Sequence, residues 1–170
     1  ANWLLHMVEN LLSVTRITDG GASVLKKTPE AAEEVLFDAV STSRKRYPDL
    51  QIKTVIPDEF VTAPMDPLLI KQVLLNLIEN AYFHARSTKP LECTLSSTED
   101  AIKFCIRDYG TGIAPDRLSG IFDAVPSAPS SAASTVDTRK GMGIGLSICK
   151  AIVNAHNGEI TARNLTEGAE

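Results

Sequence analysis

The stretch Asp108-Tyr109-Gly110-Thr111-Gly112 decides the fold of this chain when it is taken together with two other segments. Gly141-Met142-Gly143-Ile144-Gly145-Leu146 follows it as a second glycine-rich turn, and Asn76-Leu77-Ile78-Glu79-Asn80-Ala81 precedes it as one face of a predicted helix. A carboxylate stands at the head of the first turn. Each segment alone is a weak indication, but their order and spacing are informative.

The composition of the 170 residues is that of one soluble globular domain with a small appendage. Hydrophobic residues make up 44% and charged residues 22%, as in an ordinary soluble protein. No apolar run approaches the ~18 residues of a membrane span, and no signal peptide opens the chain. The net charge of -4 argues against a nucleic-acid partner, because binding phosphates requires a concentrated basic surface.

The cysteines, Cys93, Cys105 and Cys149, are odd in number and widely separated. They lack the spacing of metal ligands, which disfavours a zinc site. We therefore expect reduced thiols in a reducing compartment rather than a disulfide.

Residues 2–17 carry two adjoining apolar stripes: Leu4, Met7, Leu11 and Val14 form the first, and Leu5, Val8 and Leu12 the second. Alternating three-four spacing predicts a helix, and two stripes predict contact with more than one neighbouring helix. We expect those neighbours to lie outside this chain. The alternative is an N-terminal helix folded onto its own domain. Asp19-Gly20-Gly21 ends the helix.

Helices and strands are mixed through the rest of the chain. We expect strands at Ala22–Lys27, Ile52–Ile56, Phe60–Ala63, Leu91–Ser97, Ile102–Asp108 and Glu159–Arg163. We expect helices from Pro29 to near Tyr47, from Asp66-Pro67 onward with Ile70, Val73, Leu74, Leu77 and Ala81 buried, and from Gly145 to Asn157-Gly158. This order predicts an α/β (α+β) two-layer sandwich, with one mixed sheet and helices on one face.

Asp108 shares its parity with Ile102, Phe104 and Ile106, so a strand would point its side chain toward the buried face. A buried carboxylate costs several kcal/mol unless a donor meets it. The Gly-x-Gly that follows lets the backbone approach a flat ligand closely, which suits the amine and ring edge of adenine. The alternative is an Asp that ends a strand and caps a β-turn.

Asn76 and Asn80 lie four residues apart and share one helix face, opposite the Leu77 and Ala81 stripe, with Glu79 beside them. The amide oxygen of asparagine is a suitable ligand for Mg2+, which prefers oxygen and keeps several waters. The alternative is an ordinary solvated helix face.

Gly141, Gly143 and Gly145 lead directly into a helix, whose free amides and dipole favour an anion such as phosphate. No strand precedes them, as a Rossmann motif requires, and the Gly-Lys-Ser/Thr ending of a P-loop is missing. Arg139 and Lys140 either reach a terminal phosphate or form a solvated basic pair. The Ser/Ala/Pro-rich segment between the two turns, Ala124–Thr138, is interpreted as a lid over the nucleotide.

These segments resemble the boxes of the ATP-binding domain shared by sensor histidine kinases, gyrase, Hsp90 and MutL. The N, G1, F and G2 boxes are matched in turn by Asn76–Ala85, Asp108–Ile113, Ile121-Phe122-Asp123 and Gly141–Leu146. Residues 3–17 and 146–153 are similar to the KdpD potassium-sensor kinases, the first run to their second dimerisation helix. We therefore expect part of a dimerisation helix at residues 1–18 and a catalytic ATP-binding domain at residues 19–170, with a lid near residues 123–140.

The resemblance implies transfer of the ATP γ-phosphoryl group to a histidine, then to an aspartate of a response regulator. It implies a site in which Asp108 holds the adenine amine, shaped by Gly110, Gly112 and Ile113. Asn80 ligates Mg2+ and Asn76 lies near the metal; the expected catalytic residues are Asn76, Glu79 and Asn80. Phosphate ligands and positive charge come from Gly141, Gly143, Gly145, Leu146, His84, Arg139 and Lys140. Such a site needs no covalent nucleophile, because phosphoryl transfer depends on positioning and charge neutralisation.

The resemblance also implies the wider context. The domain is expected to be cytoplasmic, in a bacterial protein that is membrane-anchored and homodimeric at full length. Its expected partners are ATP, its own dimerisation and phosphoacceptor helices, and a response-regulator receiver domain.

Three departures from the family pattern stand out. In the family, the histidine that accepts the phosphoryl group is followed by an acidic residue and later by Thr-Pro or Asn-Pro. None of His6, His84 and His156 is followed by such residues. The absence of that context leads us to expect that the acceptor helix is missing. Phe83 stands where many members place a phosphate-contacting lysine. The chain also stops at Gly168-Ala169-Glu170, where a final strand is expected, so we expect a fragment.

Alternative functions remain at this point. A gyrase- or Hsp90-like ATPase needs a glutamate base at the position of Asn76, and an amide cannot accept that proton. A non-catalytic module that has lost nucleotide chemistry is favoured only by Phe83. A kinase of another sensory pathway is the third alternative.

Overall fold

The computed structural model describes residues 25–85, 87–123 and 144–170. Its elements are, in chain order, β1 (Thr28–Ala31), α2 (Ala32–Arg46), β2 (Ile52–Val55), β3 (Thr62–Met65), α3 (Pro67–His84), β4 (Leu91–Ser97), β5 (Ile102–Arg107), α4 (Pro115–Leu118) and α5 (Ile144–Ala155). The predicted helix at residues 2–17, the predicted lid and the predicted ligands Arg139, Lys140, Gly141 and Gly143 lie outside the described residues.

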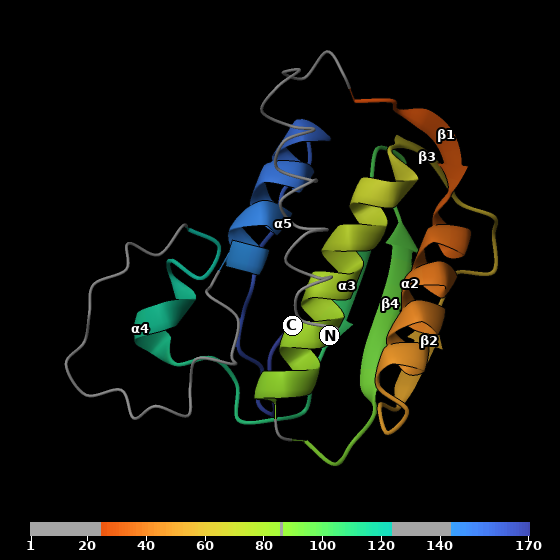
Figure 1. Cartoon of the computed structure of the whole chain (residues 1–170). Helices are drawn as coiled ribbons and strands as arrows, with labels where there is room; N and C mark the ends of the chain where they lie inside the picture. Colours follow the sequence, from red (N-terminus) through yellow and green to blue (C-terminus); the bar gives the residue numbers. More distant parts are fainter. Residues whose placement is uncertain (1–24, 86, 124–143) are drawn as a thin grey trace.

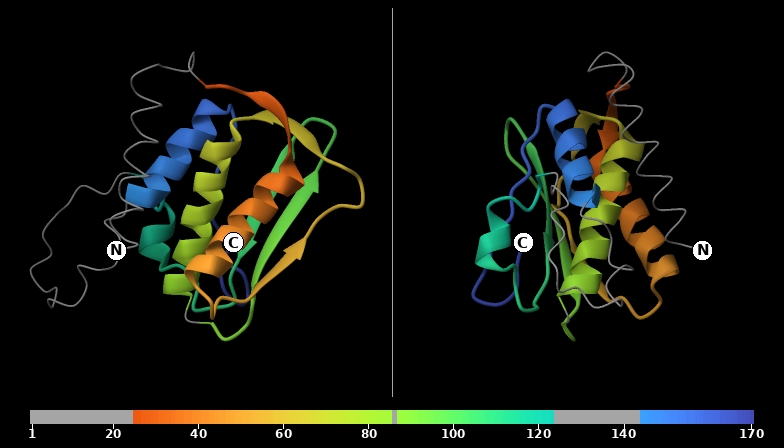
Figure 2. Two further views of the ribbon diagram at one scale, coloured as in Figure 1. Left: turned by 45° about the vertical axis from the view of Figure 1, so that its right-hand side comes forward. Right: turned by 60° about the vertical axis from the view of Figure 1, so that its left-hand side comes forward.

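Helices α2, α3 and α5 lie side by side over one face of the strands (Figure 1, Figure 2). In the three-stranded sheet the order is β2-β4-β5, with β2 parallel and β5 antiparallel to β4. Strands β1 and β3 form a separate antiparallel pair. The predicted fold class is confirmed as a mixed sheet with helices on one face, although the described strands form two sheets rather than one.

The main core lies between the sheet and helices α2 and α3. On β4, Leu91, Cys93 and Leu95 are buried while the residues between them are half-buried, as the period of a strand requires. Leu36 of α2 and Ile78 of α3 are fully buried against them. A second, smaller cluster joins α3 to α5 and consists of Leu69, Val73, Ile148, Cys149 and Ile152.

Helix α3 begins where the sequence predicts. Asp66 is its N-cap, and Oδ1 of Asp66 accepts the N–H groups of Leu68 and Leu69 at 3.1 and 3.2 Å. Pro67 occupies the first helical position, where its missing N–H costs nothing. The N–H of Asp66 itself donates to Nε2 of His156 at 3.0 Å, so the last turn of α5 is fixed to the start of α3.

The buried face of α3 is wider than predicted. Val73 and Leu74 are buried as expected, but Ile70, Leu77 and Ala81 are only half-buried. Burial also extends to Leu69, Gln72, Leu75, Asn76, Ile78 and Glu79. The reason is that α3 is the middle helix and packs against α2 on one side and α5 on the other.

Two predicted strands are displaced. Residues 25–27, the described part of the strand expected at Ala22–Lys27, are irregular. A strand is found instead at Thr28–Ala31, so Pro29 lies in β1 and the helix begins at Ala32. Proline is tolerated in this two-stranded ribbon because a free strand edge needs no ladder donor. Strand β3 starts at Thr62 rather than Phe60, because the backbone of Val61 bonds instead to Ala32 and Glu33 at the start of α2.

The strand predicted at Glu159–Arg163 is absent, and this part of the chain is irregular. A strand requires a neighbouring strand for its hydrogen bonds. Beside the end of β5, the N–H of Asp108 donates instead to the carbonyl of Ala169 at 2.9 Å. Only an isolated bridge joins Asn164 to Ala169.

The cysteines are free thiols, as predicted. Burial raises the pKa of Cys93 and of Cys149 to about 12, so both are protonated and unreactive at neutral pH. Among the helices that the structure describes, none combines the length and the apolar character needed to cross a membrane.

Candidate functional site

Three segments meet at the C-terminal half of α3. The turn after β5 contacts α3 at Ala85, where the N–H of Thr111 donates to the Ala85 carbonyl at 3.3 Å. The first turn of α5 contacts α3 at Asn76, whose Nδ2 donates to the carbonyl of Gly145 at 3.4 Å. The structure therefore brings the turn after β5 and the described start of α5 against α3, the helix that carries Asn76 and Asn80.

Asp108 stands directly after β5 and is half-buried. Its Oδ1 accepts the N–H of Gly110 at 2.8 Å, which is the turn-capping contact that the alternative interpretation foresees. No described residue hydrogen-bonds Oδ2 of Asp108. One oxygen thus caps the turn and the other is left for a ligand, so the two interpretations are compatible.

The glycines of this turn have separate structural reasons. A Cβ on Gly110 would lie 1.8 Å from the carbonyl oxygen of Ala85, so a larger residue cannot sit against the end of α3. Gly112 has a φ of +74°, in the left-handed region that favours glycine. In this structure the close approach predicted at Gly110 is made by the protein's own backbone.

Asn76 is only 2% exposed and lies in the interface between α3 and α5. Its amide donates to Gly145, and its Oδ1 accepts from Nε2 of Gln72 at 3.4 Å. Its side chain therefore positions the start of α5, which the sequence predicts to bind phosphates. A Cβ on Gly145 would lie 3.7 Å from Cγ of Asn76, an ordinary contact.

Asn80 and His84 continue the stripe of Asn76 along α3, one and two turns further on. Asn80 is half-buried and His84 is exposed. No hydrogen bond from a described residue occupies the side chain of Asn80, so its oxygen is available to a ligand.

Glu79 faces α2 instead of this stripe. It is 6% exposed, and its Oε1 lies 3.2 Å from Nη1 of Arg46. Burial, together with the neighbouring Glu79 carboxylate, raises the pKa of Tyr47 to about 12. These contacts give Glu79 a structural role between two helices, and its predicted catalytic role stays a prediction.

Phe83 also packs toward α2. Its ring makes edge-on contacts with Tyr47 at 5.4 Å and with Tyr82 at 5.1 Å between centroids. The side chain is nevertheless 51% exposed. Phe83 supplies no positive charge here, and among the predicted cationic residues only His84 lies within the described part of the chain.

The first turn of α5 is the described part of the predicted phosphate site. Gly145 and Leu146 are half-buried there, and a helix N-terminus favours an anion. Lys150, on the next turn, pairs with Asp123 at 2.7 Å and fixes the end of the segment that follows α4. The roles predicted for Arg139, Lys140, Gly141 and Gly143 stay predictions.

Two residues that support the turn are missed by sequence reasoning. Asn164 bonds both backbone groups of Ile113, accepting from its N–H and donating to its carbonyl, each at 2.7 Å. A Cβ on Gly168 would lie 2.0 Å from the carbonyl oxygen of Asp108. A glycine in a turn is a detectable signal, but nothing in the local sequence distinguishes Asn164.

A protein cage for a metal is not found within residues 25–85, 87–123 and 144–170, where no three His, Cys, Asp or Glu side chains are grouped suitably. Mg2+ in nucleotide sites usually has few protein ligands, because substrate phosphates and waters complete its shell. The free oxygen of Asn80 fits such a site.

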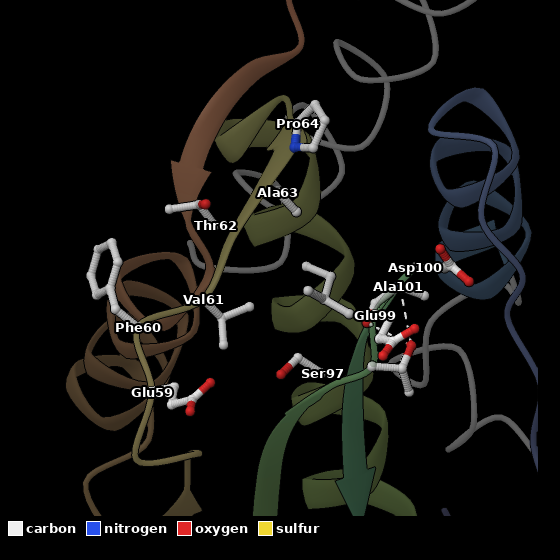
Figure 3. Close-up of a pocket in the computed structure, with 12 residues that line it drawn as sticks. Glu59, Phe60, Val61, Thr62, Ala63, Pro64, Ser97, Glu99, Asp100 and Ala101 are labelled. Atoms are coloured by element: carbon white, nitrogen blue, oxygen red, sulfur yellow. Dashed lines mark hydrogen bonds between the residues drawn. The ribbon is translucent and has the colours of Figure 1, made fainter.

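A separate open groove lies at the opposite end of β5, between residues 59–64 and the tip of the β4–β5 hairpin at residues 97–102 (Figure 3). Its lining includes the carboxylates Glu59, Glu99 and Asp100. None of the residues predicted to bind nucleotide lines it, so it is not part of the candidate site.

Residues 65–170 match the model of a family described as histidine kinase-, DNA gyrase B-, and HSP90-like ATPase. The chain is 38% identical over 166 residues to the sensor protein KdpD of Clostridium acetobutylicum, covering 98% of this chain and 18% of that protein. It is 34% identical over 165 residues to the sensor protein KdpD of Escherichia coli, covering 96% of this chain and 17% of that protein. The chain thus spans less than a fifth of the length of either relative.

Solved structures share the fold. A crystal structure of full-length ShkA in complex with AMPPNP superimposes with a TM-score of 0.75 at 23% identity, covering 98% of this chain and 34% of that one. At this level of identity the likeness concerns the fold alone.

Proposed function

The chain belongs to the family of histidine kinase-, DNA gyrase B- and HSP90-like ATPases, and we propose that it is the ATP-binding catalytic domain of a sensor histidine kinase. The observation that carries the proposal is the arrangement around Asp108. One carboxylate oxygen caps the turn, no described residue hydrogen-bonds the other, and Gly110 lets the turn pack against Ala85 at the end of α3. Asn76 and Asn80 lie on the same helix.

The adenine end of the site is assigned to Asp108. Its free oxygen would accept a hydrogen bond from the exocyclic amine of adenine. Guanine presents a carbonyl at that position, so two acceptors would face one another. Gly112 and Ile113 would border the base, since both belong to the turn that Asn164 and Ala85 hold in place.

The phosphate end is assigned to the first turn of α5 and to the stripe on α3. Asn80 would ligate Mg2+, and Asn76 would keep the start of α5 at the correct distance through its bond to Gly145. Gly145 and Leu146, with Gly141 and Gly143, would bind phosphates. Positive charge would come from His84, Arg139 or Lys140. Because phosphoryl transfer needs alignment and charge neutralisation, these residues are sufficient without a covalent nucleophile.

Transfer to a protein histidine fits the site better than hydrolysis does. Hydrolysis needs a base that activates water, and Asn76 is a neutral amide. Glu79, the nearest carboxylate along α3, is paired with Arg46 on the α2 side.

The partners follow from this reaction. The acceptor would be a histidine on a dimerisation helix, within a homodimer, and a response-regulator receiver domain would take the phosphoryl group next. The similarity to two KdpD proteins supports a KdpD-like kinase, a cytoplasmic domain of a membrane-anchored protein that senses potassium or turgor.

The test measures binding and transfer separately. Calorimetry with Mg-ATP should show binding that weakens when Mg2+ is removed. Radiolabelled ATP should leave no acid-labile label on this chain alone, but should label an added KdpD-type acceptor helix pair. Absence of Mg-ATP binding would favour a degenerate module, and ATP hydrolysis without transfer would favour a water-activating ATPase.

A further inference from the structure

The C-terminal turn at residues 164–169 contacts the Asp108–Ile113 turn at both of its ends. The Ala169 carbonyl accepts the N–H of Asp108 at 2.9 Å, and Gly168 lies so close to Asp108 that no Cβ would fit. Lys89 pairs with Glu167 at 2.6 Å and also lies over the ring of Tyr109, 5.4 Å from its centroid. The two turns therefore form one packed unit.

Asn164 makes the most specific contact in this unit. Its side-chain amide hydrogen-bonds both backbone groups of one residue, as a residue of a neighbouring strand would. It accepts from the N–H of Ile113 and donates to the carbonyl of Ile113, each at 2.7 Å. Its Oδ1 would also lie 2.9 Å from a Cβ on Gly112, so it packs directly on the left-handed residue of the turn. Asn164 is exposed, so neither the burial of its side chain nor the core explains these contacts.

From these contacts we infer that Asn164 is a positioning residue for the nucleotide: it holds Gly112 and Ile113 in the conformation that binds the base, and so couples the C-terminal turn to the site. The inference rests on the proposed function. Ala85 holds the turn at Thr111 from the α3 side, and Asn164 holds it at Ile113 from the C-terminal side. Without Asn164 the second half of the turn loses both side-chain bonds to the Ile113 backbone.

The test compares wild type, Asn164→Ala, Asn164→Asp and the control Asn154→Ala, all in the full 170-residue chain. Asn154 is exposed on α5, and its side chain makes no hydrogen bond to a described residue. Without nucleotide, the Ile113 amide should exchange with solvent at least tenfold faster in Asn164→Ala. Asn164→Asp keeps the acceptor for that amide and should fall between Asn164→Ala and wild type, whereas Asn154→Ala should match wild type.

Mg-ADP supplies the second measurement. Losing two neutral hydrogen bonds should weaken Mg-ADP binding about tenfold in Asn164→Ala, with the chain still folded at the temperature used. Mg-ADP should also slow exchange at Leu165 in wild type but not in Asn164→Ala, because coupling between two sites is reciprocal. A role confined to stability would not change this response.

The outcomes are separable. Unchanged exchange at Ile113 in Asn164→Ala overturns the inference whatever the nucleotide does. Faster exchange with unchanged Mg-ADP affinity also overturns it, since the bonds would then brace the turn without positioning the base. Failure of wild type to bind Mg-ADP overturns the proposed function and the positioning role together, and the exchange data would still show whether the two turns are joined.

Discussion

Helix α3 packs against α2 through one interface and against α5 through another, and the two differ in chemistry. Toward α2 the contact is a large apolar core, closed by the ion pair of Arg46 with Glu79 at 3.2 Å and by the tilted rings of Tyr47 and Tyr82. Toward α5 the apolar cluster is small, and beside it the buried amide of Asn76 donates one hydrogen bond to the carbonyl of Gly145 at 3.4 Å.

We therefore expect the two sides of α3 to differ in purpose, with stability depending on the α2 side and nucleotide binding on the α5 side. The α2 side is mainly packed apolar side chains, so we expect it to contribute chiefly to the stability of the fold. A polar contact between α3 and the first turn of α5 can instead respond to charge at the end of α5. Substitutions on the α2 side should therefore change the free energy of unfolding, and substitutions on the other side should mainly change nucleotide binding.

The largest expected effect is that of Ile78→Ala, on the α2 side. Ile78 is 0% exposed, and removing its side chain should lower the free energy of unfolding by about 2–5 kcal/mol. Chemical denaturation measures this, and Mg-ATP affinity should be unchanged while the chain is folded. Leu68→Ala is the matched control on the same helix, because Leu68 is 63% exposed and should change stability by under about 0.5 kcal/mol. Equal losses from both variants would contradict the α2-side core.

Asp108→Ala should have the next largest effect, on binding. A hydrogen bond to a charged group contributes about 1.5–3 kcal/mol, so Mg-ATP affinity should fall roughly tenfold to a hundredfold. Calorimetry measures it, with Asp116→Ala of α4 as an exposed control. Wild type should prefer ATP to GTP, and equal affinity for the two nucleotides would rule out the assigned adenine contact.

Asn76→Ala and Asn80→Ala form a pair on one stripe. Removing the amide of Asn76 should lower the free energy of unfolding by about 1 kcal/mol and also weaken Mg-ATP binding, since α5 loses its contact. Asn80→Ala should leave the unfolding free energy unchanged and reduce only the Mg2+-dependent part of binding. If Asn80→Ala binds nucleotide with unchanged Mg2+ dependence, the metal ligand is wrongly assigned.

The last expected effect is confined to alkaline pH and is absent at neutral pH. The unfolded thiols ionise near 9, whereas burial keeps Cys93 and Cys149 protonated to about 12. The unfolded state therefore releases protons first, so the contribution of the two thiols to the free energy of unfolding should be constant below pH 8 and fall as the pH rises from about 9 to about 12. Tyr47 adds to the fall above pH 10, because its pKa is raised to about 12 as well.

Single thiol variants assign this pH dependence to the two interfaces. Cys93→Val removes the contribution of the main core, and Cys149→Val removes that of the α3–α5 cluster. Denaturant midpoints between pH 7 and pH 11 should fall less steeply in each variant. An unaltered slope in the double variant would show that other groups cause the loss.

The comparison also shows what could be read from local sequence. The start of α3 was predictable because Asp66 and Pro67 act on amides only two and three residues away. The β4–β5 hairpin was predictable because the alternation of apolar and polar residues and the short polar turn are also local features of the sequence. The prediction of a strand at Glu159–Arg163 was wrong, because the local sequence does not show whether a partner strand is available.

The candidate site also contains residues that could be predicted from the sequence and contacts that could not. Asp108 and Asn80 could be singled out, because a carboxylate before Gly-x-Gly and two asparagines at helical spacing have chemical meaning in the sequence itself. The pairing of Glu79 with Arg46 could not, since 33 residues separate them and only the packing of two helices brings them together.

The α/β class, the cap of α3, the β4–β5 turn and the residues proposed to bind nucleotide could all be predicted from the sequence, because each depends on neighbours along the chain. Only the packed structure shows that Gly110 contacts Ala85 and that Asn164 bonds the backbone of Ile113. Those contacts join segments as far as 51 residues apart, and no local preference encodes them. They exist only once the helices and the sheet have packed.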